Sequence, residues 1–488
     1  MTRQAFFDGA VAVKEEPVRH KASVLLRRLS RSPFFLNLAS VTGATIIGKM
    51  ISLVALGYPA RKLGPMSFGL VGYAVSVSAY ARILLSPGLM MWGTREIARD
   101  RAQAGKTLLI VNLTQLFLAC FAYCGLALFA FRTAEPAQRM VFFLSGLVLF
   151  QTALNADWAF NGLEVMRIPA AFGVLTSALS VAALFTLVHS PSDVSRYAAV
   201  APLSGIFVIS LTYCYLYGKM RLPWMWPSAQ ALRVALWSSL PLGGAIALVT
   251  VLHHANSLIV KAYLGTASLG VFLSAYNLLD LAGQVPSLLG TVFLPRLARV
   301  VAEDAGYGAR EARVFAQVHM TLAFFIAAFM LAEAPAIIRI LYGPRYVGAV
   351  SLLRLMAIAV IFNYAICGYT NCLISFGRDR VILAVVIVCT VASVGGGLLL
   401  VPRLGTLGAA IAVTGVDLSG WLVSLPYYRR TVGSLQFSTW WRPLLGGLSI
   451  VGASLFLHSL GLPIWERAPV AAACFLPFVI SDVRRLLL

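Results

Sequence analysis

Residues 381–401 read VILAVVIVCTVASVGGGLLLV and contain no charged side chain. Because a helix rises about 1.5 Å per residue, about 20 apolar residues cross the hydrocarbon layer of a bilayer, which is about 30 Å thick. Runs of similar length fill most of the chain, and the connections between them are too short for a soluble domain. The sequence therefore predicts an all-α integral membrane protein with about 14 transmembrane helices. The spans are expected at 36–57, 67–91, 107–131, 140–161, 168–189, 197–218, 235–260, 268–294, 314–342, 348–376, 381–401, 405–427, 440–460 and 466–481.

The overall composition agrees with a membrane protein. Of the 488 residues, 59% are hydrophobic and 12% are charged, whereas a soluble domain carries about 25% charged residues. This excludes a water-soluble fold. The seven cysteines lie inside apolar runs without the spacing of metal ligands, and the chain has no glycine-rich phosphate-binding loop. We therefore expect no metal site, no cofactor and no direct coupling to ATP hydrolysis.

The basic residues orient the chain in the membrane. If both termini lie in the cytoplasm, 25 of the 39 Lys and Arg residues fall on the cytoplasmic side and 8 fall in the outside connections. This bias follows the positive-inside rule and predicts an even number of spans with cytoplasmic termini. The net charge of +21 is scattered over short loops, so it indicates topology and not a nucleic-acid partner.

A short internal repeat divides the chain. The segment LGPMSFG at 63–69 recurs as LGTASLG at 264–270, each time between the first and second spans of a set of six. Both sets start on the same side of the membrane, so we expect a parallel repeat that suits alternating access about a central site. The predicted units are a basic cytoplasmic arm (1–35), a six-helix bundle (36–218), an amphipathic cytoplasmic linker (219–234), a second six-helix bundle (235–427), and two last helices with a cytoplasmic tail (428–488).

Several basic side chains lie within the apolar spans. A charge at the middle of a transmembrane helix costs about 2.5 to 3.5 kcal/mol, so each one needs a partner, a water-filled cavity or a function. A cavity lined by such cations suits an anion, because low dielectric strengthens each attraction and Arg holds a phosphate through paired hydrogen bonds. The predicted anion-binding residues are Lys49, Arg82, His254 and Lys261, and the predicted polar residues of the same cavity are Thr42, Thr45, Asn256 and Asn277.

Structural roles are alternatives for some of these residues. Lys261 lies close enough to its span end to extend toward the lipid headgroups, and His254 would also suit packing against a neighbouring helix. Asp280 and Asp157 are either ion-pair partners of buried cations or a proton or sodium site, and the pairing role is favoured. Asp417 follows no polar face and is expected to make a local helix contact.

Two parts of the chain carry the motifs of a known family. Those in the first half, within 58–101, are Leu63-Gly64, Phe68-Gly69, Pro87-Gly88-Leu89 and Arg95-Glu-Ile-Ala98, and those in the second half are Leu341-Tyr-Gly343 with Tyr346, Gly377-Arg378, Gly405 and Gly408-Ala409-Ala410. From about residue 35 to 430 the chain thus resembles oligosaccharide flippases of polysaccharide biosynthesis, the Wzx type. These belong to the multidrug/oligosaccharidyl-lipid/polysaccharide exporter superfamily, which also holds multidrug and toxin extrusion antiporters and the lipid II flippase.

The resemblance implies export of a polyprenyl-diphosphate-linked oligosaccharide from the inner to the outer leaflet of the bacterial cytoplasmic membrane, for capsule, O-antigen or exopolysaccharide assembly. The diphosphate would bind Lys49, Arg82, His254 and Lys261. Transport would draw on an ion gradient or the membrane potential through Asp280 or His254, and Asp157 is a further candidate for the coupling ion. The implied partners are the lipid-linked oligosaccharide, the bilayer, and polysaccharide polymerase and export machinery. No catalytic residue is expected, because such proteins perform no bond chemistry.

Other functions fit the sequence less well. A drug or cation antiporter of the same superfamily is disfavoured by the basic cavity, and the lipid II flippase by the absence of its Arg-Glu-rich first span. A membrane polymerase or ligase would need a long outer loop, and the longest connections are cytoplasmic and short. A structural scaffold would not explain charged residues at bilayer depth.

Overall fold

The computed structural model of the protein describes residues 43–44, 47–53, 55–85, 88–433 and 438–479. The regular secondary structure of these residues is entirely helical, which confirms the predicted all-α class. Among them, ten helical stretches are long and apolar enough to cross a membrane. The predicted arm 1–35 and the predicted cavity residues Thr42 and Thr45 lie outside the described residues.

Two of the spans predicted in the first half are interrupted in the structure. The predicted span 67–91 extends past the end of one helix into the next, and Gly88 caps the second helix in the left-handed conformation, with φ of 84°. The predicted span 140–161 is divided over three short helices. The first-half helices are α3 (Tyr58–Ile83), α4 (Leu89–Arg99), α5 (Ala104–Thr133), α6 (Pro136–Gly146), α7 (Val148–Ala153), α8 (Asp157–Gly162), α9 (Arg167–Leu187) and α10 (Val194–Tyr213).

The second half begins with an element that joins two predicted spans. Helix α11 (Ala229–Glu303) contains both 235–260 and 268–294, with a break in its helical geometry at Gly265. The other predicted spans of the second half correspond to separate helices. These are α12 (Ala305–Leu341), α13 (Ala349–Ser375), α14 (Arg380–Leu404), α15 (Thr406–Val432), α16 (Ser438–Ser459) and α17 (Ile464–Ala473). However, α17, at the predicted span 466–481, has only 10 residues and is not among the ten described stretches long enough to cross a membrane.

The two copies of the repeated segment have the same backbone conformation at their glycines. Gly64 in α3 has φ of 77° and ψ of 170°, and Gly265 in α11 has φ of 82° and ψ of −179°. Side chains with a Cβ rarely adopt a φ in this range. The glycine at this position is therefore needed in both copies for the same sharp break between two helices.

The two repeated segments also pack against each other. A Cβ atom added at Gly69 would lie 2.0 Å from the carbonyl oxygen of Thr266, and one added at Gly270 would lie 2.0 Å from that of Pro65. Both distances are far below van der Waals contact. Helices α3 and α11, one from each half, thus approach each other backbone to backbone at reciprocal positions of the repeat.

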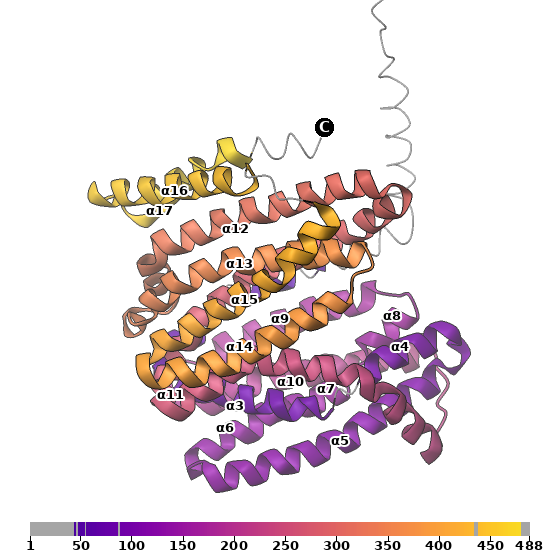
Figure 1. Ribbon diagram of the computed structural model, residues 1–488. Coiled ribbons are helices and arrows are strands. Elements are labelled where there is room, and N and C mark those ends of the chain that lie inside the picture. The colour runs from indigo at the N-terminus through magenta and orange to yellow at the C-terminus, as the bar shows by residue number, and fades with distance from the viewer. Residues whose placement is uncertain (1–42, 45–46, 54, 86–87, 434–437, 480–488) are drawn as a thin grey trace, which may run out of the picture.

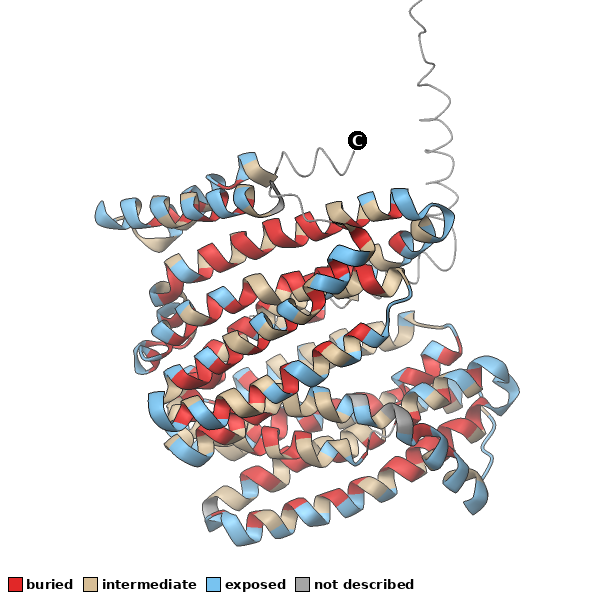
Figure 2. Ribbon diagram, viewed as in Figure 1, coloured by how far each residue is buried: buried red, intermediate tan, exposed pale blue. Residues whose placement is uncertain are grey.

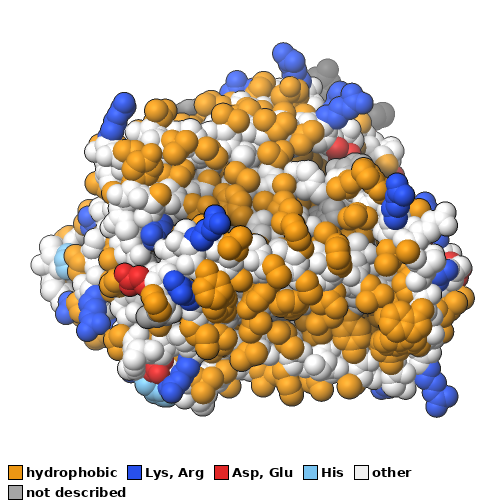
Figure 3. All heavy atoms as spheres, turned by 90° about the horizontal axis from the view of Figure 1, so that it is seen from below, with side chains coloured by type: hydrophobic (Ala, Val, Ile, Leu, Met, Phe, Trp, Pro, Cys, Tyr) orange, Lys and Arg blue, Asp and Glu red, His pale blue; other side chains and the backbone are white. Residues whose placement is uncertain are grey.

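The helices lie side by side, with most of the first half in the lower part of Figure 1 and α12, α13 and α15 in the upper part. Buried residues line the inward sides of the helices, and exposed residues follow the outward sides (Figure 2). Many outward residues are large and apolar, such as Phe117 and Phe121 on α5, which are 74% and 70% exposed. Figure 3 shows the side of the molecule that faces downward in Figure 1. Hydrophobic side chains cover much of this side, and most Lys and Arg side chains lie toward its margins. Such a band suits contact with lipid tails.

Helices α16 and α17 are attached to the second half by a buried ion pair. The Arg467 Nη2 atom of α17 lies 2.8 Å from the Glu333 Oε2 atom of α12. Ser454 of α16 donates a hydrogen bond to the other carboxylate oxygen at 2.5 Å, and His458 of α16 contacts the guanidinium. The carboxylate of Glu333 therefore connects three helices.

Candidate functional site

Three adjoining pockets form a row from the first half of the chain to the second. The first pocket, of about 350 Å³, lies mainly among first-half helices, and the middle pocket, of about 380 Å³, lies between α3 and α11. The acidic pocket, of about 400 Å³, lies among α11, α13, α14 and α15. Tyr197 and His254 line both the first and the middle pocket, and Tyr276 and Asp280 line both the middle and the acidic pocket. We call the three together the central cavity.

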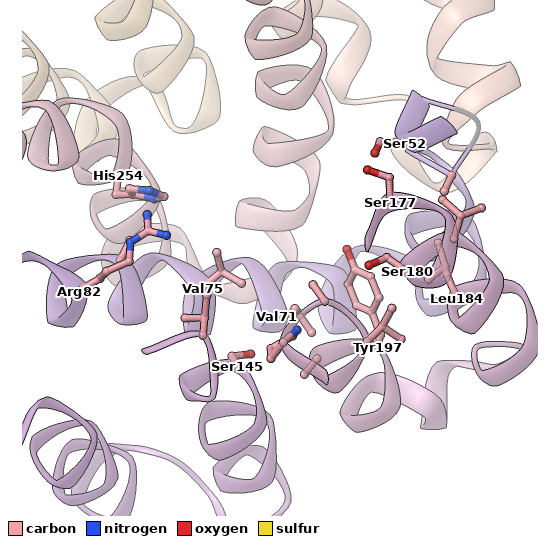
Figure 4. Close-up of a pocket in the computed structure, with 18 residues that line it drawn as sticks. Ser52, Val71, Val75, Arg82, Ser145, Ser177, Ser180, Leu184, Tyr197 and His254 are labelled. Atoms are coloured by element: carbon pink, nitrogen blue, oxygen red, sulfur yellow. The ribbon is translucent and has the colours of Figure 1, made fainter. Parts of the chain in front are cut away.

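Arg82 and His254 lie next to each other at one end of the first pocket (Figure 4). Arg82 is in the last turn of α3 and His254 is in α11, so each half contributes one basic side chain. Arg82 is exposed to the pocket and forms no salt bridge within the described residues. A guanidinium without a carboxylate partner attracts anions strongly at low dielectric, and its paired N–H groups match a phosphate.

The other two predicted cations lie elsewhere. Lys49 lines a fourth, apolar pocket of about 360 Å³, whose remaining lining residues are apolar except for Gln284, which also lines the acidic pocket. The Lys261 ammonium lies 5.0 Å from the centre of the Tyr73 ring, a cation–π contact between α11 and α3. The structure thus brings Arg82 and His254 together, and it places Lys49 and Lys261 outside the central cavity.

Two carboxylates, those of Asp280 and Asp417, line the acidic pocket. The Asn363 side-chain amide of α13 donates to Asp417 of α15 at 3.1 Å, and the Gln284 amide donates to Asp280 of the same helix, α11, at 3.2 Å. The central cavity is therefore basic at its first-half end and acidic at its second-half end. Asp417 makes a contact between two helices, and not the local helix contact expected from the sequence.

The predicted polar residues of the second half also lie at the central cavity. Asn277 lines the middle pocket. Asn256 lines the acidic pocket and donates to Ser393 of α14 at 3.0 Å. Asp157 lies apart from all three pockets, at the start of α8, where its carboxylate accepts a hydrogen bond from Asn155 at 3.0 Å.

Several cavity residues were missed by the sequence analysis. Tyr197 and Ser145 line the first pocket as isolated hydroxyls of apolar spans. Ser180 also lines it, and its spacing of three residues from Ser177 on α9 was a signal that could have found both. A lone serine or tyrosine in an apolar span gives little signal, because most such hydroxyls bond to the backbone of their own helix. Asp417 was visible as an intramembrane charge, but its partner Asn363 lies 54 residues away.

Comparisons with known proteins are consistent with this architecture. The family model described as "Polysaccharide biosynthesis protein" matches residues 35–301 of the chain. A protein of Shigella dysenteriae named "Putative O-antigen transporter" is 23% identical over 304 residues, which are 61% of this chain and 75% of that protein.

Two solved structures show the same fold at low sequence identity. The lipid II flippase MurJ in an inward closed conformation superimposes with a TM-score of 0.70 at 12% identity, over 92% of this chain and 99% of that one. A multidrug resistance MATE family transporter of the MOP superfamily, in its inward-facing conformation, gives 0.64 at 18% identity, over 81% of this chain and 98% of that one. At these identities the likeness concerns the fold alone.

Proposed function

The chain belongs to the polysaccharide biosynthesis protein family, and from this premise we propose that it is a flippase for a polyprenyl-diphosphate-linked oligosaccharide in the cytoplasmic membrane of a bacterium. The name of the relative in Shigella dysenteriae, which refers to O-antigen transport, supports a lipid-linked sugar as substrate. The substrate would serve the assembly of capsule, O-antigen or exopolysaccharide. Moving it makes and breaks no bond, so we assign no catalytic residue.

The observation that carries the proposal is the pair of basic side chains at the first pocket. Arg82 and His254 come from α3 and α11, and Arg82 has no carboxylate partner in the described residues. A diphosphate bound there would contact both halves at once. Binding would thus favour one arrangement of the halves over another, which is the requirement for alternating access.

The apolar pocket is a suitable binding surface for the lipid tail of the substrate. It is lined by apolar side chains of α11, α12 and α13, and Lys49 is its one charged residue among those described. A polyprenyl chain would lose little by leaving the bilayer for such a surface. In this proposal Lys49, which lines the apolar pocket, and Lys261 are further phosphate contacts, and Lys261 becomes available when its cation–π contact with Tyr73 opens.

We further propose the membrane arrangement expected from the sequence. It has about 14 spans, with two six-helix bundles at 36–218 and 235–427, the linker 219–234 at the cytoplasmic surface, and both termini in the cytoplasm. The equal conformations of Gly64 and Gly265 support two repeated units. The excess of Lys and Arg in alternate connections supports the orientation.

A reconstituted system tests the function. Liposomes containing the protein and a fluorescent polyprenyl-diphosphate sugar should show movement of the sugar between leaflets, measured by loss of fluorescence to an external quencher. We expect Arg82→Ala to slow this movement at least about tenfold, because a hydrogen bond to a charged group contributes about 1.5 to 3 kcal/mol. Arg82→Lys should retain part of the rate, since it keeps the charge and loses the paired donors.

Arg354→Ala is the matched control. Arg354 is an exposed arginine of α13 that lines none of the described pockets of the central cavity, so its loss should leave the rate within about twofold. Equal rates for Arg82→Ala and the wild-type protein would contradict the proposed phosphate site. Absence of movement by the wild-type protein would contradict the proposed function.

A drug or cation antiporter is the second candidate, because the acidic pocket contains Asp280 and Asp417. Two carboxylates in one pocket favour a cation over an anion. Export of a fluorescent organic cation from cells that produce the protein, lost in Asp280→Asn but retained in Arg82→Ala, would favour this candidate over the flippase.

A further inference from the structure

The first pocket has two chemically different ends. Arg82 and His254 lie at one end, and the hydroxyl-bearing residues Ser52, Ser177, Ser180 and Tyr197 gather at the other (Figure 4). Val71 and Val75 lie between the two ends in the same view. No charged side chain of the described residues lines the second end. We call this second end the hydroxyl end.

Some hydroxyl groups of this pocket have no protein partner. Ser52 and Ser177 donate to the carbonyls of Gly48 and Gly173 one turn earlier, at 2.9 and 3.1 Å, as serines in helices commonly do. Ser180 and Tyr197 make no hydrogen bond within the described part of the chain, and the Ser145 hydroxyl is likewise buried without a partner there. Ser180 and Tyr197 line the pocket, so their hydroxyls are free to bond to a molecule bound there. The Ser145 hydroxyl is buried, and leaving such a group without a partner costs about 1 to 3 kcal/mol, which also favours a bound partner.

Tyr197 combines a hydroxyl without a protein partner with a place at the central cavity. Tyr217, Tyr342 and Tyr369 also have hydroxyls without a partner in the described part of the chain, but they line none of its three pockets. The hydroxyls of Tyr58, Tyr346 and Tyr364 each donate to a backbone carbonyl at 2.9 Å. The ring of Tyr197 instead stacks on the ring of Phe68, with ring centroids 6.5 Å apart and an angle of 25° between the ring planes. Tyr197 also lines both the first and the middle pocket. The packing holds the ring while its hydroxyl has no protein acceptor.

The backbone adds an acceptor at the same pocket. Pro202 lies inside α10 and has no N–H group, so the carbonyl of Ala198, four residues earlier, lacks its usual helical donor. Both residues line the first pocket. The pocket therefore offers hydroxyl donors and a carbonyl acceptor in an otherwise apolar and uncharged setting, which matches a neutral molecule with many hydroxyl groups.

We propose that the hydroxyl end is a subsite for the sugar that is directly bonded to the diphosphate, and that Ser180 and Tyr197 determine which sugar is accepted. The inference rests on the proposed function for its phosphate end. The first sugar is held next to the phosphate by a single ester bond, so it is the part of the oligosaccharide that must share one pocket with Arg82. Apolar side chains such as Val71 contact the C–H face of the ring, while Ser180, Tyr197 and the Ala198 carbonyl bind its hydroxyls.

Binding measurements test the subsite without depending on transport. The purified protein in detergent is titrated with inorganic pyrophosphate and with a panel of glycosyl diphosphates that differ in the sugar, and the ligand-induced rise in melting temperature is followed. We expect one class of glycosyl diphosphate to bind at least about tenfold more tightly than pyrophosphate. In the double variant Ser180→Ala/Tyr197→Phe this preference should disappear while pyrophosphate binding is unchanged.

The controls use the same chemical changes away from the pocket. Ser210→Ala removes an exposed hydroxyl of α10, and Tyr263→Phe removes one from an exposed ring of α11; neither residue lines the pocket. Both should keep the sugar preference. Arg82→Ala should weaken pyrophosphate and glycosyl diphosphates alike.

The possible outcomes separate the two proposals. Equal affinity of the wild-type protein for pyrophosphate and every glycosyl diphosphate would overturn the subsite, and so would an unchanged preference in the double variant. A sugar preference that depends on Ser180 and Tyr197, found together with no movement of the lipid-linked substrate in liposomes, would support the subsite and overturn the flippase function.

Discussion

The Tyr364 hydroxyl of α13 donates a hydrogen bond to the carbonyl oxygen of Ala282 in α11, at 2.9 Å. Pro286 lies four residues after Ala282 in the same helix and has no N–H group to satisfy that carbonyl. The tyrosine thus replaces the missing helical donor from a neighbouring helix. Because lipid offers no alternative partner, such a replacement allows a proline inside a membrane helix.

Tyr364→Phe should destabilise the protein by about 1 to 2 kcal/mol, because it leaves the Ala282 carbonyl buried without a donor. The loss should be smaller in a Pro286→Ala background, where residue 286 regains an N–H for that carbonyl. Unfolding of the four proteins in detergent gives the coupling energy of the double-mutant cycle. A coupling energy of zero would show that the hydroxyl and the proline act independently.

Removing one partner of the Arg467–Glu333 pair should cost about 3 to 5 kcal/mol, because it leaves the other charge buried. The Glu333 side chain is 1% exposed and that of Arg467 is 10% exposed. We expect Arg467→Met/Glu333→Gln together to cost less than the sum of the two single changes. The measurement is the free energy of unfolding, with protease sensitivity of 438–479 as a local readout.

The exposed pair Arg296–Glu311 is the control for that prediction. Its nitrogen and oxygen atoms lie 3.2 Å apart, and the arginine side chain is 58% exposed. Exposed ion pairs contribute about 0 to 1 kcal/mol, so Arg296→Met should change stability by no more than that. A similar loss for both arginines would show that burial is not the cause.

Gly69→Ala should weaken the contact between α3 and α11. The new Cβ would lie 2.0 Å from the Thr266 carbonyl oxygen, so one helix must shift, which costs about 1 to 3 kcal/mol in a packed interface. We expect a lower melting temperature and faster labelling of a cysteine placed at 266. Gly125→Ala on α5 is the matched control, because no atom lies within 4 Å of its added Cβ.

The effect should be symmetric with respect to the repeat. Gly270→Ala places its Cβ 2.0 Å from the Pro65 carbonyl oxygen and should behave like Gly69→Ala. If both changes are tolerated as well as Gly125→Ala, the close approach of the two repeated segments does not hold in the protein in solution.

Asp280→Asn should abolish the dependence of transport on an imposed proton or sodium gradient, because Asp280 lines the central cavity. Asp157→Asn should leave that dependence intact, since Asp157 lies at the start of α8, outside the cavity. Both variants are compared in liposomes with and without a gradient. A loss of gradient dependence in Asp157→Asn alone would reverse the assignment of the coupling residue.

Several residues that the sequence analysis grouped together lie near one another in the structure. His254, Asn256 and Asn277 lie at the central cavity, as does Arg82, and these could be expected there because helical periodicity assigns residues to a common face. Periodicity does not tell which neighbour that face meets. Lys261 is on the face expected for it, but that face meets Tyr73 of α3.

The sequence by itself determined that the described chain is helical and suited to a membrane, because a backbone in lipid must satisfy its own hydrogen bonds and long apolar runs leave only helices. It also revealed the repeated segments at 63–69 and 264–270, whereas the breaks at Gly64 and Gly265 came from the structure. Only the tertiary structure decided that Arg82 meets His254, that Asn363 meets Asp417, and that the free hydroxyls share a pocket with the arginine. Those contacts join helices far apart in the chain, and they depend on how whole helix surfaces pack, which no local pattern specifies.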